Sequence, residues 1–390
     1  MDKKRIDELY LFYEDYLLNN CIPFWLKNSI DREYGGYSTS LDRTGKIYNT
    51  DKSVWFQGRG TWMFSRLCNS IDKKPQWLEA AKSGYEFIKN YCCDTDGRMF
   101  FTVTREGKPL QKRRYMFSET FSIIGLAEYS RASGDEAALI KAKETLELVT
   151  DLYKNPWIVT PKIDPRTRSL KSLSLPMILL STIQVLREIE NTDCYDTFAS
   201  ELVNTVCGDF LKPDEHALFE TVGLNGERID SPQGRCINPG HSIETAWFLL
   251  HEGLYRNDDA IIKNALNILE WSIEIGWDKE YGGILYFVDI EGKPAEQLEW
   301  DMKLWWPHTE ALYAFLLAYS ITKDTKYAEW YERIHDWSFG HFEDKDYGEW
   351  FGYLHRDGTV SNTLKGSMWK GMFHLPRALL LNYKLLEKMR

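Results

Sequence analysis

The hydrophobic and polar positions of the chain follow one pattern that recurs along its whole length. A turn rich in Asp, Gly and Tyr opens each unit, a short run of alternating aromatic and polar residues follows, and a second tight turn closes it. Alternation with a period of two between such turns predicts a β-hairpin. The copies of this pattern begin at Asp31, Asp94, Asp214, Asp278 and Asp344.

These copies are spaced about 65 residues apart, except that the interval between the second and third is about twice as long. A sixth, degenerate copy is therefore expected in the long interval, where the Pro-rich stretch 155–172 lies. Between the hairpins, apolar residues recur at helical spacing, as in Pro75–Tyr91, Phe117–Ser133 and the final segment 368–389. Each unit is thus predicted to contribute one hairpin and two amphipathic helices.

Six units with two helices each predict an all-α protein, an (α/α)6 barrel of twelve helices with short β-hairpins at one mouth. Such a ring buries every apolar face without leaving an exposed end. The alternative, an open helical solenoid, needs polar capping repeats, and the last helix is as apolar as the middle ones. Residues 1–390 are expected to form a single catalytic domain.

Composition narrows the possible partners and compartments. The formal net charge of −10 argues against a nucleic-acid-binding surface, which needs a basic face. The first residues are charged and no apolar run approaches the roughly 18 residues of a membrane span, so neither signal peptide nor membrane helix is expected and the predicted location is cytoplasmic. The seven cysteines are scattered without a CxxC spacing, which favours free thiols over disulfides or a zinc site.

Polar, charged and aromatic residues gather where the helix after each hairpin begins. In a closed barrel these starts converge on one mouth, which is the main indication of a functional site. The segments are Trp55–Trp62, Arg114–Glu119, Gly234–Trp247, Lys303–Glu310 and Lys370–Arg377.

Such a mouth is predicted to stabilise negative charge that develops on a bound molecule. Helix N-termini present unsatisfied N–H groups there, and Arg59, Arg377 and Lys370 add positive charge. A histidine near neutral pH takes and returns protons. His241 is followed at i+3 by Glu244, which we expect to orient its imidazole or raise its basicity.

The second candidate base is His374, which lies between Lys370 and Arg377 in sequence. This cationic neighbourhood is expected to keep the imidazole neutral and ready as a base. His308 follows a proline at a helix start and is assigned either to substrate contact or to capping. The remaining histidines are assigned to turns or outer helices with structural roles: His216, His251, His335, His341 and His355.

Trp306 and the other tryptophans of these segments suit either the core or a stacking platform for a sugar ring. Several catalytic motifs are missing from the sequence: HExxH, a Walker A loop and a GxSxG elbow. The stretch His308–Glu310 matches half of a zinc-deaminase signature but lacks its PCxxC partner. Metal-dependent, nucleotide-hydrolysing and serine-hydrolase mechanisms are therefore disfavoured, and no metal site is expected.

At these residues the sequence resembles the N-acylglucosamine 2-epimerase family, also known from its renin-binding members, nearly from end to end. The motifs that carry the resemblance include VWFQGRGTWMFSRL, GRCINPGHSIETAWFLL, QLEWDMKLWWPHTEAL and KGMFHLPR. The family has the (α/α)6 fold. The resemblance implies His241 and His374 as catalytic residues and Arg59 and Glu310 as substrate-binding residues. Glu244, Trp306, Arg377 and Lys370 are further candidates for substrate binding.

The resemblance implies that N-acetyl-D-glucosamine and N-acetyl-D-mannosamine are interconverted by moving the proton at C2. Ring opening, loss of the C2 hydrogen and reprotonation on the opposite face would suit two opposed histidines, with the direction of reaction deciding which is base and which is acid. The resemblance also implies a homodimer without a prosthetic group, with ATP as an allosteric activator. The residues quoted do not locate an ATP site.

Three alternatives stay open from the sequence. Cellobiose 2-epimerases and mannose-type aldose–ketose isomerases resemble the chain less, because they carry a histidine where this chain has Leu173–Met177. A glycoside hydrolase would use two of the carboxylates of Glu119, Glu244 and Glu310. A non-catalytic binding protein is the third alternative.

Overall fold

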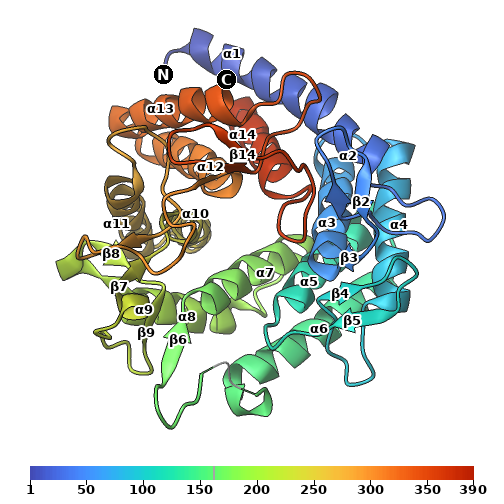
Figure 1. The fold of residues 1–390 in the computed structure, drawn as a ribbon, viewed down its shortest axis with the longest axis horizontal. Coiled ribbons are helices and arrows are strands. Elements are labelled where there is room, and N and C mark those ends of the chain that lie inside the picture. Colours follow the sequence, from blue (N-terminus) through green and yellow to red (C-terminus); the bar gives the residue numbers. More distant parts are fainter. Residues whose placement is uncertain (161–162) are drawn as a thin grey trace.

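The helices of the computed structural model, which describes residues 1–160 and 163–390, form two concentric rings (Figure 1). Successive inner helices pack against one another, and each is backed by an outer rod. The inner ring consists of α3 (Val54–Ser70), α5 (Phe117–Ser133), α7 (Ser174–Glu190), α10 (Pro239–Arg256), α12 (Trp305–Thr322) and α14 (His374–Met389). The predicted (α/α)6 barrel is confirmed.

The outer ring begins at the N-terminus. Its first rod is α1 (Lys3–Asp15), extended by the π-helical turn η1 (Tyr16–Cys21) and α2 (Ile22–Asn28). The other outer rods are α4 (Pro75–Tyr91), α6 (Glu136–Lys154), α8 (Asp196–Thr205), α11 (Asp259–Gly276) and α13 (Thr325–Phe342). Within the described part of the chain, no helix is long and apolar enough to cross a membrane.

Inner and outer helices differ in how much of their surface is buried. The outer α4 buries one stripe, which includes Trp77, Ala81 and Tyr85, whereas the inner α12 is buried all round over most of its length. This follows because an inner helix contacts two inner neighbours and an outer rod. The helices predicted at Pro75–Tyr91 and Phe117–Ser133 have the bounds found here.

The final helix is shorter than predicted. It starts at His374 and not at 368, because residues 367–373 form an irregular turn in which the N–H of Ser367 donates to the carbonyl of Lys370. Phe373, at the N-cap, has a non-helical backbone with φ −135° and ψ −74°.

Short strands at the hairpin mouth tie neighbouring units together. The strand that leads into an inner helix pairs antiparallel with the following hairpin, in β3–β4, β6–β9, β10–β11 and β12–β13, and a bridge between Leu41 and Gly366 joins the first unit to the last. The strands are β1 (Ser40–Leu41), β2 (Ile47–Asn49), β3 (Lys52–Ser53), β4 (Thr102–Val103), β5 (Pro109–Gln111), β6 (Leu170–Ser172), β7 (Leu211–Lys212), β8 (Ala217–Leu218), β9 (Thr221–Gly223), β10 (Cys236–Ile237), β11 (Val288–Asp289), β12 (Lys303–Leu304), β13 (Tyr353–Leu354) and β14 (Val360–Asn362).

The degenerate third unit, predicted over 155–172, contributes a 3-10 turn η2 (Pro156–Ile158) and strand β6. Residues 161–162 of this stretch lie outside the described residues. The remaining short elements belong to the fourth unit: η3 (Val206–Phe210), η4 (Pro213–Glu215) and α9 (Pro232–Arg235).

Three buried Asp–Lys–Arg clamps repeat around the mouth. In each, the aspartate that opens a hairpin accepts hydrogen bonds from a lysine that precedes the inner helix of the same unit and from an arginine of the next hairpin. The N···O distances lie between 2.8 and 3.2 Å, and the lysine side chains are fully buried. The clamps are Asp31 with Lys52 and Arg105, Asp278 with Lys303 and Arg356, and Asp344 with Lys365 and Arg43.

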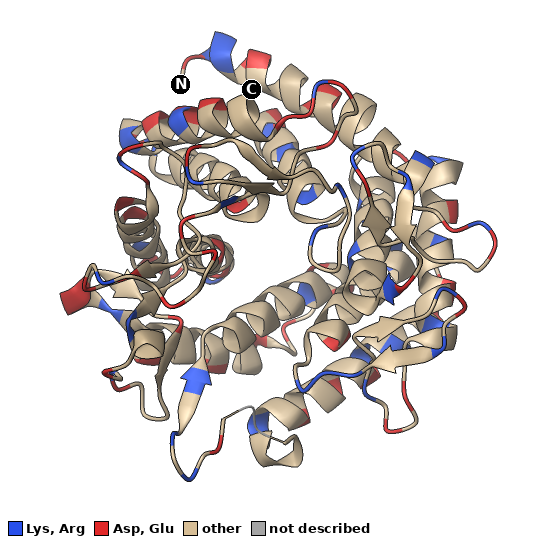
Figure 2. Ribbon diagram, viewed as in Figure 1, with Lys and Arg blue, Asp and Glu red and all other residues tan. Residues whose placement is uncertain are grey.

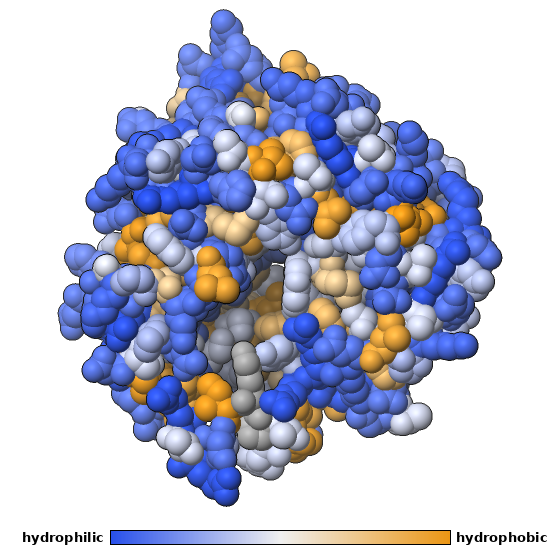
Figure 3. Space-filling model, viewed as in Figure 1, coloured by the Kyte–Doolittle hydropathy of each residue, from blue (hydrophilic) through white to orange (hydrophobic). Residues whose placement is uncertain are grey.

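The clamp of the last hairpin reaches back to the first, so it closes the ring. Basic and acidic residues are interspersed around the whole ring, and neither sign gathers on one side of the view in Figure 2. The space-filling view of the same face is hollowed at its centre (Figure 3), where the starts of the inner helices converge.

We predict that Asp278→Asn destabilises the fold, because it leaves the ammonium group of Lys303 buried without a counter-charge. Removing one partner of a buried ion pair costs about 3–5 kcal/mol. The matched control is Asp94→Asn in the second hairpin, whose ion pair with Lys112 is partly exposed and should matter little. Urea denaturation measures both. Equal shifts of the two midpoints would show that the clamp does not hold the mouth together.

Candidate active site

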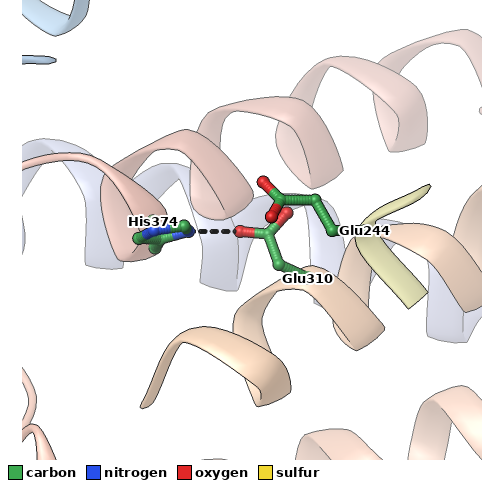
Figure 4. Close-up of side chains that lie close together, drawn as sticks. All are labelled: Glu244, Glu310 and His374. Carbon is green, nitrogen blue, oxygen red and sulfur yellow. Dashed lines mark hydrogen bonds and ion pairs between the residues drawn. The ribbon is translucent and has the colours of Figure 1, made fainter. Parts of the chain in front are cut away.

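Side chains from the first two turns of three inner helices meet in the barrel. Helix α10 supplies His241 and Glu244, α12 supplies Glu310, and α14 supplies His374 and Arg377. Figure 4 shows Glu244, Glu310 and His374 approaching one another from three different helices. The convergence expected from the sequence is therefore present for these residues.

Glu310 lies at the centre of this cluster and is almost fully buried. Its Oε1 is 2.7 Å from Nδ1 of His374 and 2.7 Å from Nη2 of Arg377, and its Oε2 accepts a hydrogen bond of 2.9 Å from Trp247. Because the carboxylate accepts at Nδ1, His374 carries its proton there when neutral and its Nε2 is left as the basic nitrogen. Both carboxylate oxygens are thus engaged by protein side chains.

Arg377 contacts two carboxylates at once. Its Nη2 lies 2.6 Å from Glu244 and 2.7 Å from Glu310. Donor atoms of Glu244, Glu310 and His374 all lie within 4.8 Å of one another, a grouping of the kind that holds a metal ion. In this protein the guanidinium group of Arg377 is the cation between the two carboxylates.

His241 is held by two partners that the sequence did not indicate. The side chain of Asn238 caps α10 by accepting from the N–H of His241 at 3.0 Å, and Nδ1 of the imidazole is hydrogen-bonded to Glu220. The expected partner Glu244 binds Arg377 instead. Glu220 follows β8 in the fourth hairpin. An acidic residue within the mostly apolar run ALFETV is a local sequence signal that could have indicated a functional role for it.

The two imidazoles flank one indole. The ring of Trp306 lies with its centroid 5.1 Å from that of His241 and 5.8 Å from that of His374. Gly240 permits this, because a Cβ there would come within 2.6 Å of the Trp306 ring. Among the described residues, Nε2 of neither histidine has a hydrogen-bond partner, so both reactive nitrogens are available to a ligand.

The electrostatic surroundings of the two histidines are opposite. Burial, with Arg59 and Arg377 next in effect, holds the pKa of His374 well below its ordinary value. This direction agrees with the neutral imidazole expected from the sequence, although Arg59 takes the place that was expected for Lys370; the role of His374 as a base stays a prediction. For His241, burial lowers the pKa, but the carboxylate of Glu220, helped by Glu244, outweighs burial and raises it. One imidazole is therefore suited to accept a proton and the other to donate one.

Arg59 is held by aromatic rings. Its guanidinium carbon lies 3.9 Å from the ring centroid of Phe121 and 5.1 Å from that of Phe373, and Nη1 donates to the carbonyl of Trp369 at 3.4 Å. It forms no ion pair within residues 1–160 and 163–390, and its buried Nε has no partner there. Burial and the charge of Arg377 lower its pKa to about 9. Arg59 is thus a cation without a carboxylate, which favours an anion in the site.

Lys370 is not brought into this cluster. Its ammonium group is buried and donates to Glu349 at 2.8 Å and to the carbonyl of Lys365 at 3.1 Å. The turn 367–373 that delays the start of α14 directs this side chain to the sixth hairpin. The expectation that Lys370 binds substrate is corrected to a structural role.

Two further histidines, His308 and His251, have structural contacts. His308 is fully buried, with Nδ1 hydrogen-bonded to the carbonyl of Leu304 and Nε2 accepting from the N–H of Ile284, so it supports the fifth hairpin. His251 was assigned to a turn or an outer helix, but it lies on the inner helix α10, where Nε2 contacts the hydroxyl of Tyr313 at 2.8 Å. It lines a cavity of about 780 Å³ that extends along the barrel behind Arg377.

The carboxylates do not form the pair that a glycoside hydrolase needs. Glu119 is buried against Arg98 in the second hairpin, and Glu244 and Glu310 share the guanidinium group of Arg377. A closed (α/α)6 barrel that presents one imidazole suited to donate a proton and one suited to accept a proton, both beside the same indole, has the equipment of an acid–base enzyme.

Comparisons with known proteins identify the family to which this protein belongs. Residues 35–378 match the family model of N-acylglucosamine 2-epimerase (GlcNAc 2-epimerase). The chain belongs to this family, and with it to the isomerases.

Relatives and solved structures agree over nearly the whole chain. N-acylglucosamine 2-epimerase from Bos taurus is 36% identical over 385 residues, which cover 95% of this chain and 90% of the relative. Cellobiose 2-epimerase from Dictyoglomus turgidum is 24% identical, covering 92% and 94%. The structure of cellobiose 2-epimerase from Spirochaeta thermophila superposes with a TM-score of 0.86 at 23% identity, covering 99% of this chain and 98% of that chain.

We predict that Gly240→Ala lowers kcat/KM by about tenfold to a hundredfold, since the new Cβ displaces Trp306 and a misplacement of about 1 Å can cost that much. The control is Gly340→Ala in α13, where a Cβ meets nothing within 4 Å. Steady-state kinetics with circular dichroism compare the two variants. Normal activity in Gly240→Ala would mean that the packing of Trp306 does not set the geometry of the site.

Proposed function

We propose that this enzyme interconverts N-acetyl-D-glucosamine and N-acetyl-D-mannosamine, with His241 and His374 exchanging protons with C2 on opposite faces of the open-chain sugar. The observation that carries the proposal is the pair of imidazoles that flank Trp306 in opposite electrostatic surroundings. The names of the relatives support the reaction and the amino-sugar substrate.

The reaction needs an acidic C2–H, which the aldehyde of the ring-opened sugar supplies. In one direction, Nε2 of neutral His374 takes the proton from C2, and the C–H electrons form a C1–C2 double bond, which gives an enolate whose charge rests on O1. His241, as imidazolium, then returns a proton to the other face of C2, and the aldehyde re-forms. In the reverse direction the two rings exchange roles, so one proton leaves the sugar and one arrives in either case.

Neighbouring side chains would stabilise the anion and hold the bases. Arg59 lacks a carboxylate partner among the residues described, so its charge is available for the enolate oxygen O1. Glu310 fixes the tautomer of His374, while Arg377 pairs with Glu310 and Glu244 beside it. Trp306 offers a flat apolar surface for the sugar chain.

The start of α7 supports an N-acylhexosamine over cellobiose or mannose. The resemblance places a histidine of the related enzymes at Leu173–Met177, where this chain offers no base. Met177 is 3% exposed and packs near α10, with its Sδ 3.5 Å from the hydroxyl of Thr245. An apolar wall at this point suits a substrate that presents an acyl group better than one that needs another proton carrier.

We further propose a cytoplasmic homodimer that acts on free N-acylhexosamines without a prosthetic group and with ATP as an allosteric activator. These points rest on the family resemblance. Proton NMR of N-acetylmannosamine in deuterated water, recorded with and without ATP, reports the product, the exchange at C2 and the activation in one experiment.

In that NMR assay, we predict that His241→Asn and His374→Asn each abolish epimerisation, because the enolate can no longer be reprotonated on both faces. Each variant retains one base and should still exchange C2–H for deuterium in one epimer only, the opposite epimer in the two variants. Circular dichroism confirms that the variants fold. Epimerisation by either variant, exchange of the same epimer by both, or a ketose product from the unaltered enzyme contradicts the proposal.

We also predict a bell-shaped pH profile of kcat/KM with the same two limbs in both directions. The active pair holds one proton. A second proton enters at low pH, and because the pKa of His374 is depressed, the acid limb lies below the ordinary histidine value of 6.5. The single proton is lost at high pH, and because the pKa of His241 is raised, the alkaline limb lies above 6.5. Acid or alkaline limbs that lie at different pH in the two reaction directions would show that the two directions do not use the same pair of histidines.

A further inference from the structure

We propose that Glu220 is a positioning residue for His241: it holds the imidazole with Nε2 toward the substrate and keeps the proton of the resting enzyme on this ring. The inference deepens the proposed function and rests on it. Glu220 lies outside the motifs that carry the family resemblance, and it acts through His241 without itself meeting the reacting carbon.

The main chain at Glu220 is fixed from two sides. Its carbonyl accepts from the N–H of Leu173, which precedes α7, and its own N–H donates to the carbonyl of Cys236 at the start of β10. The side chain is only 13% exposed, and its carboxylate meets Nδ1 of His241. A carboxylate set in this way fixes both the orientation of the ring and the nitrogen that carries the inner proton.

The charges around Glu220 differ from those around Glu310, the carboxylate that is hydrogen-bonded to His374. On the His374 side, Arg377 pairs with both Glu244 and Glu310, and burial, with Arg59 and Arg377 next in effect, disfavours a proton on the imidazole. Glu220 has no lysine or arginine partner in the part of the chain that the structure describes. Its largely buried charge is therefore matched only when His241 is protonated.

The other groups near His241 do not change this balance. Glu244, on the same helix, adds negative charge and so acts in the same sense as Glu220. Cys236 and Tyr286 lie near Glu220, but burial raises the pKa of the Cys236 thiol to about 12 and that of Tyr286 well above its usual range, so both stay neutral at working pH. His374, across Trp306, is kept neutral by its own neighbours.

The free enzyme can hold its proton on His241 or on His374, and the form with the proton on His241 is the more stable one. With the proton on His241 and none on His374, the free enzyme is ready for the epimer whose C2 hydrogen faces His374. One turnover leaves the proton on His374, beside Arg59 and Arg377, where it is disfavoured. The proton must then return to His241, through solvent or through the reverse reaction, before the same epimer reacts again.

The test is Glu220→Gln, which keeps the size of the side chain and its ability to accept from Nδ1–H but removes the charge. An opposite charge within hydrogen-bond reach shifts a pKa by about 1–3 units. We expect the alkaline limb of kcat/KM to move to lower pH by that amount, equally in both directions because the equilibrium of the reaction fixes their ratio. The acid limb, set by His374, should stay in place.

Two further variants separate positioning from structure. Glu220→Asp keeps the charge and should restore the alkaline limb toward its original pH even where the rate is reduced. Glu215→Gln removes an ion pair with Arg228 in the same hairpin, which does not touch His241, and should leave the profile unchanged.

A lower rate in Glu220→Gln with both limbs unmoved overturns the inference, because it shows a structural role alone. So does a Glu220→Asp profile that matches that of Glu220→Gln. Failure of the proposed function has a different signature, since His241→Asn or His374→Asn would then still epimerise the sugar. If both histidine variants are inactive and the alkaline limb of Glu220→Gln does not move, only the role of Glu220 is wrong.

Discussion

The site depends above all on the guanidinium group of Arg377, which lies between two buried carboxylates. Without it, Glu244 and Glu310 would be like charges at close range, and their repulsion would push the two side chains apart. Glu310 would then be less able to accept from Nδ1 of His374, and the tautomer that leaves Nε2 basic would no longer be fixed. The same group also lowers the pKa of His374, so one cation both holds the base and keeps it neutral.

The barrel brings side chains from separate helices together in one site. The inner helices α10, α12 and α14 each contribute their first turns, and their mutual packing sets the distances among them. The buried clamps, such as Asp278 with Lys303 and Arg356, lock the hairpins above these helix starts. Because the clamps hold the hairpins in place over the site, charged residues that do not contact the substrate are fully buried at the mouth.

The barrel and part of the candidate site could be predicted from the sequence, because the hairpin pattern recurs at a regular interval. The hairpin repeat gave the barrel, and helix-start motifs gave His241, His374 and Glu310 as neighbours. Pairings between distant segments were beyond such reasoning. Glu220 comes from another hairpin, and the partner of His241 was instead sought one helical turn away, at Glu244. Lys370 was misplaced for a related reason: spacing along an assumed helix ignored the turn that buries its ammonium group against Glu349.

The central claim is that two imidazoles face one carbon atom from opposite sides. The most direct measurement is a crystal structure with the sugar alcohol obtained by reducing N-acetylmannosamine, a stable mimic of the open chain. The account predicts Nε2 of His241 and Nε2 of His374 on opposite faces of C2, each within about 3.5 Å, with Arg59 at the O1 end. A complex in which only one ring reaches C2, or in which both lie on the same face, would contradict it.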